Sequence, residues 1–231
     1  MTLQLQNIDR VPGGTAQSKA LSDLDHKAAK GLYGSFFKRA LDIFLVAISL
    51  PVILPTITLL ALCLLLQGTL PFYSQKRIGR NGETFRIWKL RTMVRNASAE
   101  LERHLEANPT ARHEWDSTQK LKNDPRITRF GRILRKTSLD ELPQLWNVIN
   151  GTMSLVGPRP ILPEQEKYYY GSAYYRMRPG ITGYWQISDR NNCSFVGRVA
   201  HDEEYYRNLS LKNDIKTLKK TVSVVLRATG H

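Results

Sequence analysis

One apolar segment constrains this chain more than any other feature. It runs from Ala40 to Leu66, and its only charged residue, Asp42, lies near its start. A straight helix of about 27 residues is about 40 Å long, enough to cross a bilayer core of about 30 Å. Length and composition therefore predict a membrane helix.

Two prolines, Pro51 and Pro55, lie in the middle of this segment. Each removes a backbone donor and disfavours a straight helix, at a cost of about 3 kcal/mol. The limb before Pro51 has about ten residues and rises about 15 Å, half of the bilayer core. The segment is therefore able to turn back as a re-entrant hairpin, and a kinked span is the alternative.

Basic residues stand on both sides of the apolar segment. Lys38 and Arg39 precede it, and Lys76, Arg77 and Arg80 follow it. The positive-inside rule assigns both ends to the cytoplasm, which a single crossing cannot satisfy. This charge pattern argues for the hairpin, and on the residues alone the kinked span stays open.

The charge of the whole chain indicates the class of partner. It holds 34 Lys and Arg against 20 Asp and Glu, a net charge of +14. Such a balance predicts anionic partners, either nucleic acid, an anionic leaflet or phosphorylated substrates. Cys63 lies in the apolar segment and Cys193 in a polar stretch, so no disulfide is expected and a reducing, cytosolic setting fits.

We expect one folded unit over residues 36–231 and a mobile tail over residues 1–35, which lack the apolar core of a signal peptide. The folded unit is predicted to be α+β and mainly helical. An Asn81-Gly82 turn separates two β-type runs, 72–78 and 84–90, which predicts a short hairpin.

Helices are expected in four further stretches. These are 97–107, which Asn108-Pro109 stops, 129–136, about 143–150 with Gly151 after it, and 211–227. The stretches 129–136 and 211–227 carry apolar residues on one face and basic residues on the other. That pattern is typical of an amphipathic helix in a membrane interface, or of a core helix with a solvated basic face.

The adjacent carboxylates Asp140 and Glu141 are candidates for a catalytic or metal-binding role. Ser138 to Glu141 also has the spacing of a capping box, in which Glu141 would bind the Ser138 backbone N–H. Pro143 argues against that box, because it would sit past the first position of a helix capped at Ser138. The carboxylates are therefore expected to precede the helix, with capping as their alternative role.

Two rigid turns follow in the sequence, GPRP at 157–160 and RPGITG at 178–183. The first would hold Arg159 stiffly for bidentate phosphate binding, and a plain surface turn is the alternative. The second leads to Trp185, which we expect in the core, with stacking on a base as the alternative.

Five stretches in a fixed order carry a resemblance to a known family. They are KRALDIFLVAISLPVILP, KLRTM, SLDELPQLWNVINGTMSLVGPRP, RPGITGYWQIS and HDEEYYRNLSLKNDI, and they cover the chain from about Phe36. Together they resemble the bacterial sugar transferases, the monotopic polyprenol-phosphate phosphoglycosyl transferases, in their small single-domain form.

The resemblance implies a membrane topology. The apolar stretch, about residues 38–67, would be a re-entrant helix-break-helix, broken at Ser49-Leu50-Pro51 so that Ser49 and Pro51 mark the break. A small cytosolic catalytic domain with interfacial amphipathic helices would sit on the cytoplasmic face of the bacterial inner membrane.

The resemblance also implies an activity and its site. Asp140 would attack the sugar-bearing phosphate of a UDP-sugar and expel UMP. Undecaprenyl phosphate or another polyprenol phosphate would then take the phosphosugar from the aspartate in a ping-pong cycle. Glu141 would bind Mg²⁺ together with Asp140, or manage the proton. Candidates to hold the phosphates and the nucleotide are Lys89, Arg91, Arg135, Arg159, Arg178 and Gln186.

The pattern is most similar to exopolysaccharide-initiating members that transfer galactose or glucose 1-phosphate. The expected partners are then a UDP-sugar, a polyprenol phosphate and membrane lipids, and not nucleic acid. Asp189 departs from the glycine that relatives commonly have, a change expected to alter the loop that holds the sugar or the nucleotide. Asp202 and Tyr205 match an Asp-x-x-Tyr feature that we assign to structure around the site.

The leading alternative is a membrane-anchored basic module that binds anionic lipid or nucleic acid, with an affinity that falls steeply with salt. The sequence has no recognition helix, zinc-type spacing or RNP-type motif to support it. A purely structural membrane scaffold would leave Asp140 and Glu141 with no role beyond capping.

Overall fold

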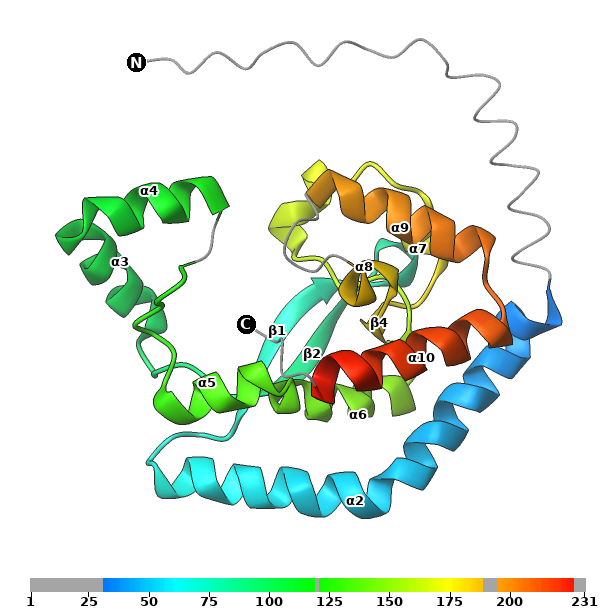
Figure 1. Ribbon diagram of the computed structural model, residues 1–231, viewed down its shortest axis with the longest axis horizontal. Coiled ribbons are helices and arrows are strands. Elements are labelled where there is room, and N and C mark those ends of the chain that lie inside the picture. The colour runs from blue at the N-terminus through cyan, green and yellow to red at the C-terminus, as the bar shows by residue number, and fades with distance from the viewer. Residues whose placement is uncertain (1–30, 119–120, 189–194, 227–231) are drawn as a thin grey trace, which may run out of the picture.

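The computed structural model describes residues 31–118, 121–188 and 195–226 (Figure 1). Its longest element is α2, Lys38–Leu66, which follows the π-helix η1, Tyr33–Phe37. Within the described ranges α2 is the one helix that is long and apolar enough to cross a membrane by length and composition. Most of the predicted tail, residues 1–30, lies outside the described part of the chain.

The predicted break in the apolar segment is observed as a bend. Helical structure continues through Pro51 and Pro55, and Figure 1 shows the two limbs of α2 at an angle to each other. The hydroxyl of Ser49 bonds to the Val46 carbonyl at 2.8 Å, and Thr56 bonds to Val52 in the same way. A proline inside a helix commonly causes such a bend, because it lacks an N–H and its ring crowds the carbonyl four residues before it.

The β-hairpin has the predicted bounds. Strand β1, Phe72–Ile78, pairs antiparallel with β2, Thr84–Leu90. Asn81 and Gly82 both adopt positive φ, 60° and 78°, which asparagine and glycine tolerate better than other residues.

A helical hairpin follows β2. Helix α3, Ala97–Ala107, has the predicted bounds and buries Leu101 and Leu105. The expected stop at Asn108 is correct, but the sequence reading missed α4, Pro109–Thr118, which begins at once. The Asn108 side chain accepts the Ala111 backbone N–H at 3.1 Å, so it caps α4.

The carboxylate segment follows α5, Arg129–Lys136, whose predicted bounds are confirmed. The chain then forms the 3₁₀ helix η3, Leu139–Gln144, and the short helix α6, Leu145–Ile149. Helical structure thus begins at Leu139 rather than near Pro143, so Asp140 and Glu141 lie inside a helical turn and not before it.

The two rigid turns pack against each other. Strand β3, Ser154–Val156, pairs parallel with β4, Gly180–Thr182. The Gly157 N–H donates to the Thr182 carbonyl at 2.9 Å, and a Cβ on Gly180 would lie 2.1 Å from the Gly157 nitrogen. Glycine is therefore required at this close approach, which joins two segments distant in the sequence.

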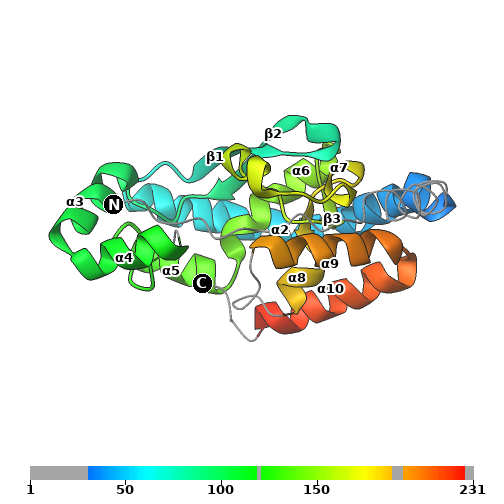
Figure 2. The same cartoon turned by 90° about the horizontal axis from the view of Figure 1, so that it is seen from above.

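The remaining elements lie between and after these strands. They are η4, Pro163–Tyr168, α7, Ala173–Arg176, α8, Tyr184–Ile187, α9, Phe195–Arg207, and α10, Leu211–Leu226. Helix α8 packs against both α9 and α10 (Figure 2).

Helix α10 packs only part of its predicted apolar stripe, including Leu218, against the core. Leu211 and Val222 are exposed, whereas Asp214 and Thr217 are buried. The Asp214 carboxylate explains this orientation, because three side chains from elsewhere donate to it. They are the Tyr33 hydroxyl at 2.6 Å, the Lys38 ammonium at 2.6 Å and the Tyr205 hydroxyl at 2.7 Å.

This cluster yields a stability prediction. We expect Asp214→Ala to lower the free energy of unfolding by about 3–5 kcal/mol, because it leaves the mostly buried Lys38 ammonium without its counter-ion and two tyrosine hydroxyls without their acceptor. The expected fall in Tm is roughly 10 °C by thermal unfolding in detergent. Asp116→Ala, at an exposed aspartate, is the matched control. Equal Tm values for the two variants would contradict the prediction.

Candidate active site

A polar cavity of about 1020 Å³ collects side chains from segments that are far apart in the sequence. Strands β1 and β2 form one wall, η3 and the GPRP turn form another, and α8 and α9 close the far end. The polar lining residues include Gln75, Arg77, Lys89, Arg135, Asp140, Glu141, Arg159, Gln186, Arg198 and Asp202. Both carboxylates singled out in the sequence thus reach one cavity.

Glu141 is held by two cations rather than by a helix cap. Its Oε1 accepts Lys89 Nζ at 2.6 Å and Arg159 Nη2 at 3.1 Å. Ser138 has a left-handed conformation, φ 57°, and only the Glu141 backbone N–H returns to it, at 3.2 Å from its carbonyl. The capping-box alternative is therefore wrong. Burial alone would raise the pKa of Glu141. The positive charges of Lys89 and Arg159 outweigh burial and hold this pKa well below its usual range.

Asp140 is buried in the same wall but is less tightly paired. Lys89 Nζ lies 3.8 Å from its Oδ2, and no described residue donates a hydrogen bond to its carboxylate. Burial raises the pKa of Asp140, opposed first by Lys89, and Glu141 raises it further. A carboxylate with few hydrogen bonds beside cations is free to react with a group that enters the cavity.

Further arginines make the cavity cationic. Arg77 donates to the Pro160 carbonyl at 3.0 Å, and Arg135 donates to the Thr92 hydroxyl at 2.9 Å. Burial lowers the pKa of Arg77 to about 10, and the nearby Arg159 adds to this. These guanidinium groups are half-buried and repel one another, so the cavity favours an anionic ligand such as a diphosphate.

The far end of the cavity has a different character. Asp202 is buried and accepts the Tyr169 hydroxyl at 2.7 Å, and burial raises the pKa of Asp202 to about 7. The Arg198 guanidinium lies 4.4 Å from the centre of the Trp185 ring. Trp185 is buried, as expected, and it also lines the cavity.

The structure brings together most, but not all, of the predicted binding residues. Lys89, Arg135 and Arg159 surround the carboxylates, and Gln186 lies at the α8 end. Arg91 lines the cavity, but its guanidinium donates to the carbonyls of the loop before β1 and of Phe72.

Arg178 lies outside the residues that line the cavity. Its Nε donates to the Gly151 carbonyl at 2.9 Å, so it braces the chain after α6. The membrane-segment residues Ser49 and Pro51 lie in α2 and also do not line the cavity.

Arg77 was missed as a site residue in the sequence. Tyr73 pairs with Lys89, so alternate β1 residues, Gln75 and Arg77, share the strand face of Lys89. This alternation along the strand was the sequence signal that could have placed Arg77 in the site. Asp202 and Tyr205 do not act together at the site. Asp202 lines the cavity, whereas the Tyr205 hydroxyl donates to Asp214. Asp189 lies outside the described residues.

The residues around Asp140 fit a magnesium ion only as part of a small ligand set. Among the described residues no group of three or more His, Cys, Asp or Glu side chains forms a metal cluster. Mg²⁺ in phosphate-transferring sites is, however, bound by one or two carboxylates plus substrate phosphates. The adjacent Asp140 and Glu141 fit that smaller set, because Asp140 has no hydrogen bond from the described chain and Glu141 uses only Oε1.

Comparison with known proteins gives consistent matches. The family described as "Bacterial sugar transferase" matches residues 33–228. The "UDP-galactose-lipid carrier transferase" of Erwinia amylovora is 47% identical over 197 residues, which are 84% of this chain and 41% of that protein. The "Exopolysaccharide production protein ExoY" of Rhizobium meliloti is 44% identical over 200 residues, 85% of this chain and 88% of that protein.

The "Undecaprenyl-phosphate galactose phosphotransferase" of Salmonella typhimurium is 47% identical over 197 residues, 84% of this chain and 41% of that protein. The chain therefore spans less than half the length of some curated relatives and most of the length of others.

Proposed function

The chain belongs to the bacterial sugar transferase family, and from this we propose that it transfers a hexose 1-phosphate from a UDP-sugar to a polyprenol phosphate. The observation that carries the proposal is the Asp140 carboxylate, which lines a cationic cavity with no hydrogen bond from the described residues. Galactose or glucose is the proposed hexose, and undecaprenyl phosphate the proposed acceptor. This choice follows the names of relatives that include an undecaprenyl-phosphate galactose phosphotransferase and a glucose-1-phosphate transferase.

The first step is attack by Asp140 on the sugar-bearing phosphorus of the donor. An Oδ–P bond forms, the bond from that phosphorus to the bridging oxygen breaks, and UMP leaves with the oxygen and its electron pair. Lys89, Arg77 and Arg159 stand where they would neutralise the charge of the diphosphate. The product of this step is a phosphosugar held on the aspartate.

The second step regenerates the enzyme. A phosphate oxygen of the polyprenol phosphate attacks the same phosphorus, and the Oδ–P bond breaks. The products are a polyprenol diphosphosugar and the free Asp140 carboxylate. Neither step needs an oxidant or a reductant.

A magnesium ion is part of the proposal. Asp140 and Glu141 would hold it together with donor phosphate oxygens, and it would neutralise charge on the diphosphate. In the chain itself, the hydrogen bonds from Lys89 and Arg159 hold the Glu141 carboxylate in one orientation beside Asp140.

We further propose that α2 is re-entrant and that the catalytic cavity faces the cytoplasm. Contacts at both ends of α2 support this. At its start, Lys38 pairs with Asp214, and Arg39 donates to the Val148 carbonyl and to the Ile149 carbonyl. Near its end, Leu64 packs on Leu90 and Leu134 in the same folded body.

A spanning helix would separate those two ends by a bilayer core of about 30 Å. The bend in α2 (Figure 1) instead allows both ends to reach one side while the middle enters the lipid. Asp42 does not face that lipid, because it is buried and accepts the Leu155 backbone N–H at 3.1 Å.

The function is tested by measuring UMP release from UDP-galactose and UDP-glucose by the purified chain in lipid nanodiscs. Without acceptor we expect a burst of UMP of about one equivalent of enzyme, as for a covalent intermediate. Undecaprenyl phosphate should convert the burst to steady turnover, and EDTA should suppress both. No UMP from either sugar, or UMP only when the acceptor is present, would contradict the proposal.

A further inference from the structure

Asp202 is a buried carboxylate of the polar cavity with no part in the two transfer steps. It lies on α9, is 3% exposed and lines the cavity. Its Oδ2 accepts the Tyr169 hydroxyl at 2.7 Å, and no other described residue donates a hydrogen bond to the carboxylate. An ionised carboxylate has room for about four hydrogen bonds. Asp202 therefore keeps unused acceptor capacity at the cavity wall.

The fold holds this carboxylate in one place. Tyr205, on the same helix, donates to Asp214 of α10 at 2.7 Å, so α9 is anchored in the core. The ring of Tyr169 packs on the ring of Tyr174, with 5.0 Å between their centres. Both tyrosines are buried, so a rigid aromatic pair orients the hydroxyl that Asp202 accepts.

The same aromatic pair connects Asp202 to the cationic part of the cavity. The Tyr174 hydroxyl donates to the Ile78 carbonyl at 2.6 Å, and the preceding residue, Arg77, lines the cavity. Burial raises the pKa of Tyr174, Asp202 raises it further and Arg77 lowers it, so both charges lie near this one ring. A UDP-sugar whose diphosphate binds beside Arg77 is therefore able to present a sugar hydroxyl to Asp202.

The electrostatics of Asp202 favour a neutral hydrogen-bond donor. Burial raises the pKa of Asp202 to about 7, although the Tyr169 hydrogen bond and the Arg198 charge oppose the rise. The described side chains thus compensate the buried charge only in part. A ligand hydroxyl would supply a further hydrogen bond, whereas phosphate oxygens are acceptors and would be repelled.

We propose that Asp202, oriented by Tyr169, binds a sugar hydroxyl of the UDP-sugar and is therefore a recognition residue for that substrate. The inference rests on the transfer reaction proposed above. The UDP-sugar carries hydroxyl groups on its hexose and on its ribose, and both have the chemistry that Asp202 selects. A hydrogen bond to a charged group is strong enough to change affinity about tenfold or more.

The test measures how the UMP burst depends on UDP-sugar concentration in Asp202→Asn. Asparagine keeps the shape and an oxygen for Tyr169, but it places an NH₂ group where the second carboxylate oxygen was. We expect the half-saturating concentrations of UDP-galactose and UDP-glucose to rise about tenfold or more, with the same burst at saturation. Glu204→Gln, at an exposed residue of α9 outside the cavity, is the matched control and should change neither quantity.

Tyr169→Phe separates recognition from a structural role. It removes the hydrogen bond between the two side chains but keeps the carboxylate. If the pair only braces α9, Tyr169→Phe should weaken UDP-sugar binding more than Asp202→Asn does, because asparagine is still able to accept from the tyrosine. Recognition predicts the opposite order, so the larger effect in Tyr169→Phe would refute the proposal.

UMP as a competitor identifies which hydroxyl is bound. UMP contains the ribose but not the hexose, so an inhibition constant that rises in Asp202→Asn assigns the ribose, and an unchanged one assigns the hexose. UDP-sugars that lack single hydroxyl groups test the unaltered chain directly, and one of them should bind about tenfold more weakly.

An unchanged half-saturating concentration in Asp202→Asn, or equal affinity of the unaltered chain for every deoxy UDP-sugar, would overturn the assignment of Asp202. Absence of the UMP burst in the unaltered chain would instead contradict the transfer reaction. The two proposals therefore fail separately.

Discussion

Asp140→Asn is expected to abolish both the UMP burst and the phosphosugar adduct on the protein. The amide has nearly the same shape as the carboxylate but lacks the anionic oxygen that would form the bond to phosphorus. Turnover should fall by a factor on the order of 10⁴ or more, as for other enzymes that lose a nucleophile. Intact-protein mass spectrometry after mixing with UDP-sugar alone measures the adduct directly.

Two variants serve as controls for this result. Asp116→Asn changes an exposed aspartate and should keep the full burst. Glu141→Gln keeps the nucleophile but loses the charged partner of Lys89 and Arg159, so turnover should fall while some adduct still forms. A normal burst in Asp140→Asn, or an adduct mapped to another residue, would remove Asp140 as the nucleophile.

The pH dependence of adduct formation follows from the same carboxylate. Burial raises the pKa of Asp140 above the usual value for an aspartate, and only the ionised form attacks. The burst rate should therefore rise with pH through that raised pKa and be lost as the pH falls below it. An acid limb at the ordinary value for an exposed aspartate would argue against the buried site.

Both ends of α2 are expected to react from the same side of the membrane. Single cysteines at Leu32 and Leu70, in a background with Cys63 and Cys193 replaced, report on the two ends, and both positions are exposed. A membrane-impermeant maleimide should label both in inverted vesicles and neither in intact spheroplasts. We expect full labelling of both cysteines in inverted vesicles and none in spheroplasts, because a bilayer core of about 30 Å excludes the reagent.

A third position calibrates this labelling. Val52→Cys lies between the two prolines and is exposed, so lipid should shield it in both preparations. One end labelled in vesicles and the other in spheroplasts would mean that α2 crosses the membrane. The contacts of Lys38 with Asp214 and of Leu64 with Leu90 would then require the folded body to reach both faces.

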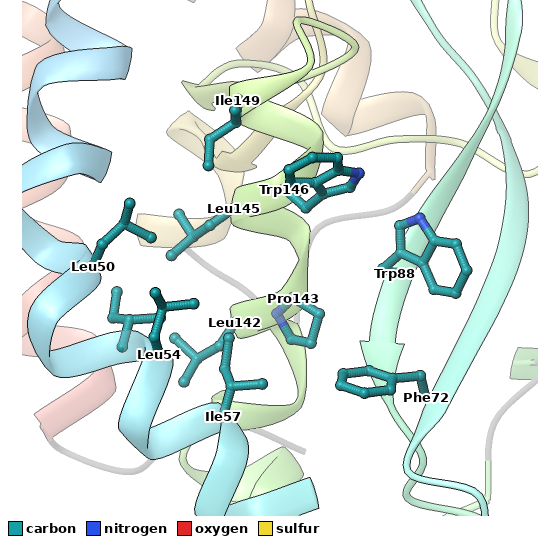
Figure 3. A pocket seen from close by; sticks show the side chains of 11 residues that line it. Leu50, Leu54, Ile57, Phe72, Trp88, Leu142, Pro143, Leu145, Trp146 and Ile149 are labelled. Carbon is teal, nitrogen blue, oxygen red and sulfur yellow. The ribbon is translucent and has the colours of Figure 1, made fainter.

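The 3₁₀ helix η3 contacts α2 and also lines the polar cavity. This short helix follows α5 and carries Asp140 and Glu141 toward the cationic cavity, while Leu142 and Pro143 line a second, apolar cavity beside α2 (Figure 3). In the transfer proposed above, η3 would thus stand between a water-soluble donor and a lipid-soluble acceptor. That arrangement suits a reaction whose two substrates come from different phases.

The sequence by itself determined the elements that depend on neighbours along the chain. The Asn81-Gly82 turn set the hairpin bounds, the spacing of Leu101 and Leu105 set α3, and the composition of α2 predicted one helix of membrane-crossing length. Each of these signals acts within a few residues, through turn conformation or helical periodicity.

Only the tertiary structure decided how the site is assembled. Glu141 had a nearby capping partner in the sequence, yet it bonds to Lys89, 52 positions away. Arg77 enters the cavity and Arg178 does not, because strand pairing and the packed turns determine which way each side chain points. Likewise α10 turns Asp214 inward to meet Lys38, 176 positions away. A buried charge is stable only beside its partner, and local sequence patterns do not encode where a partner that distant will lie.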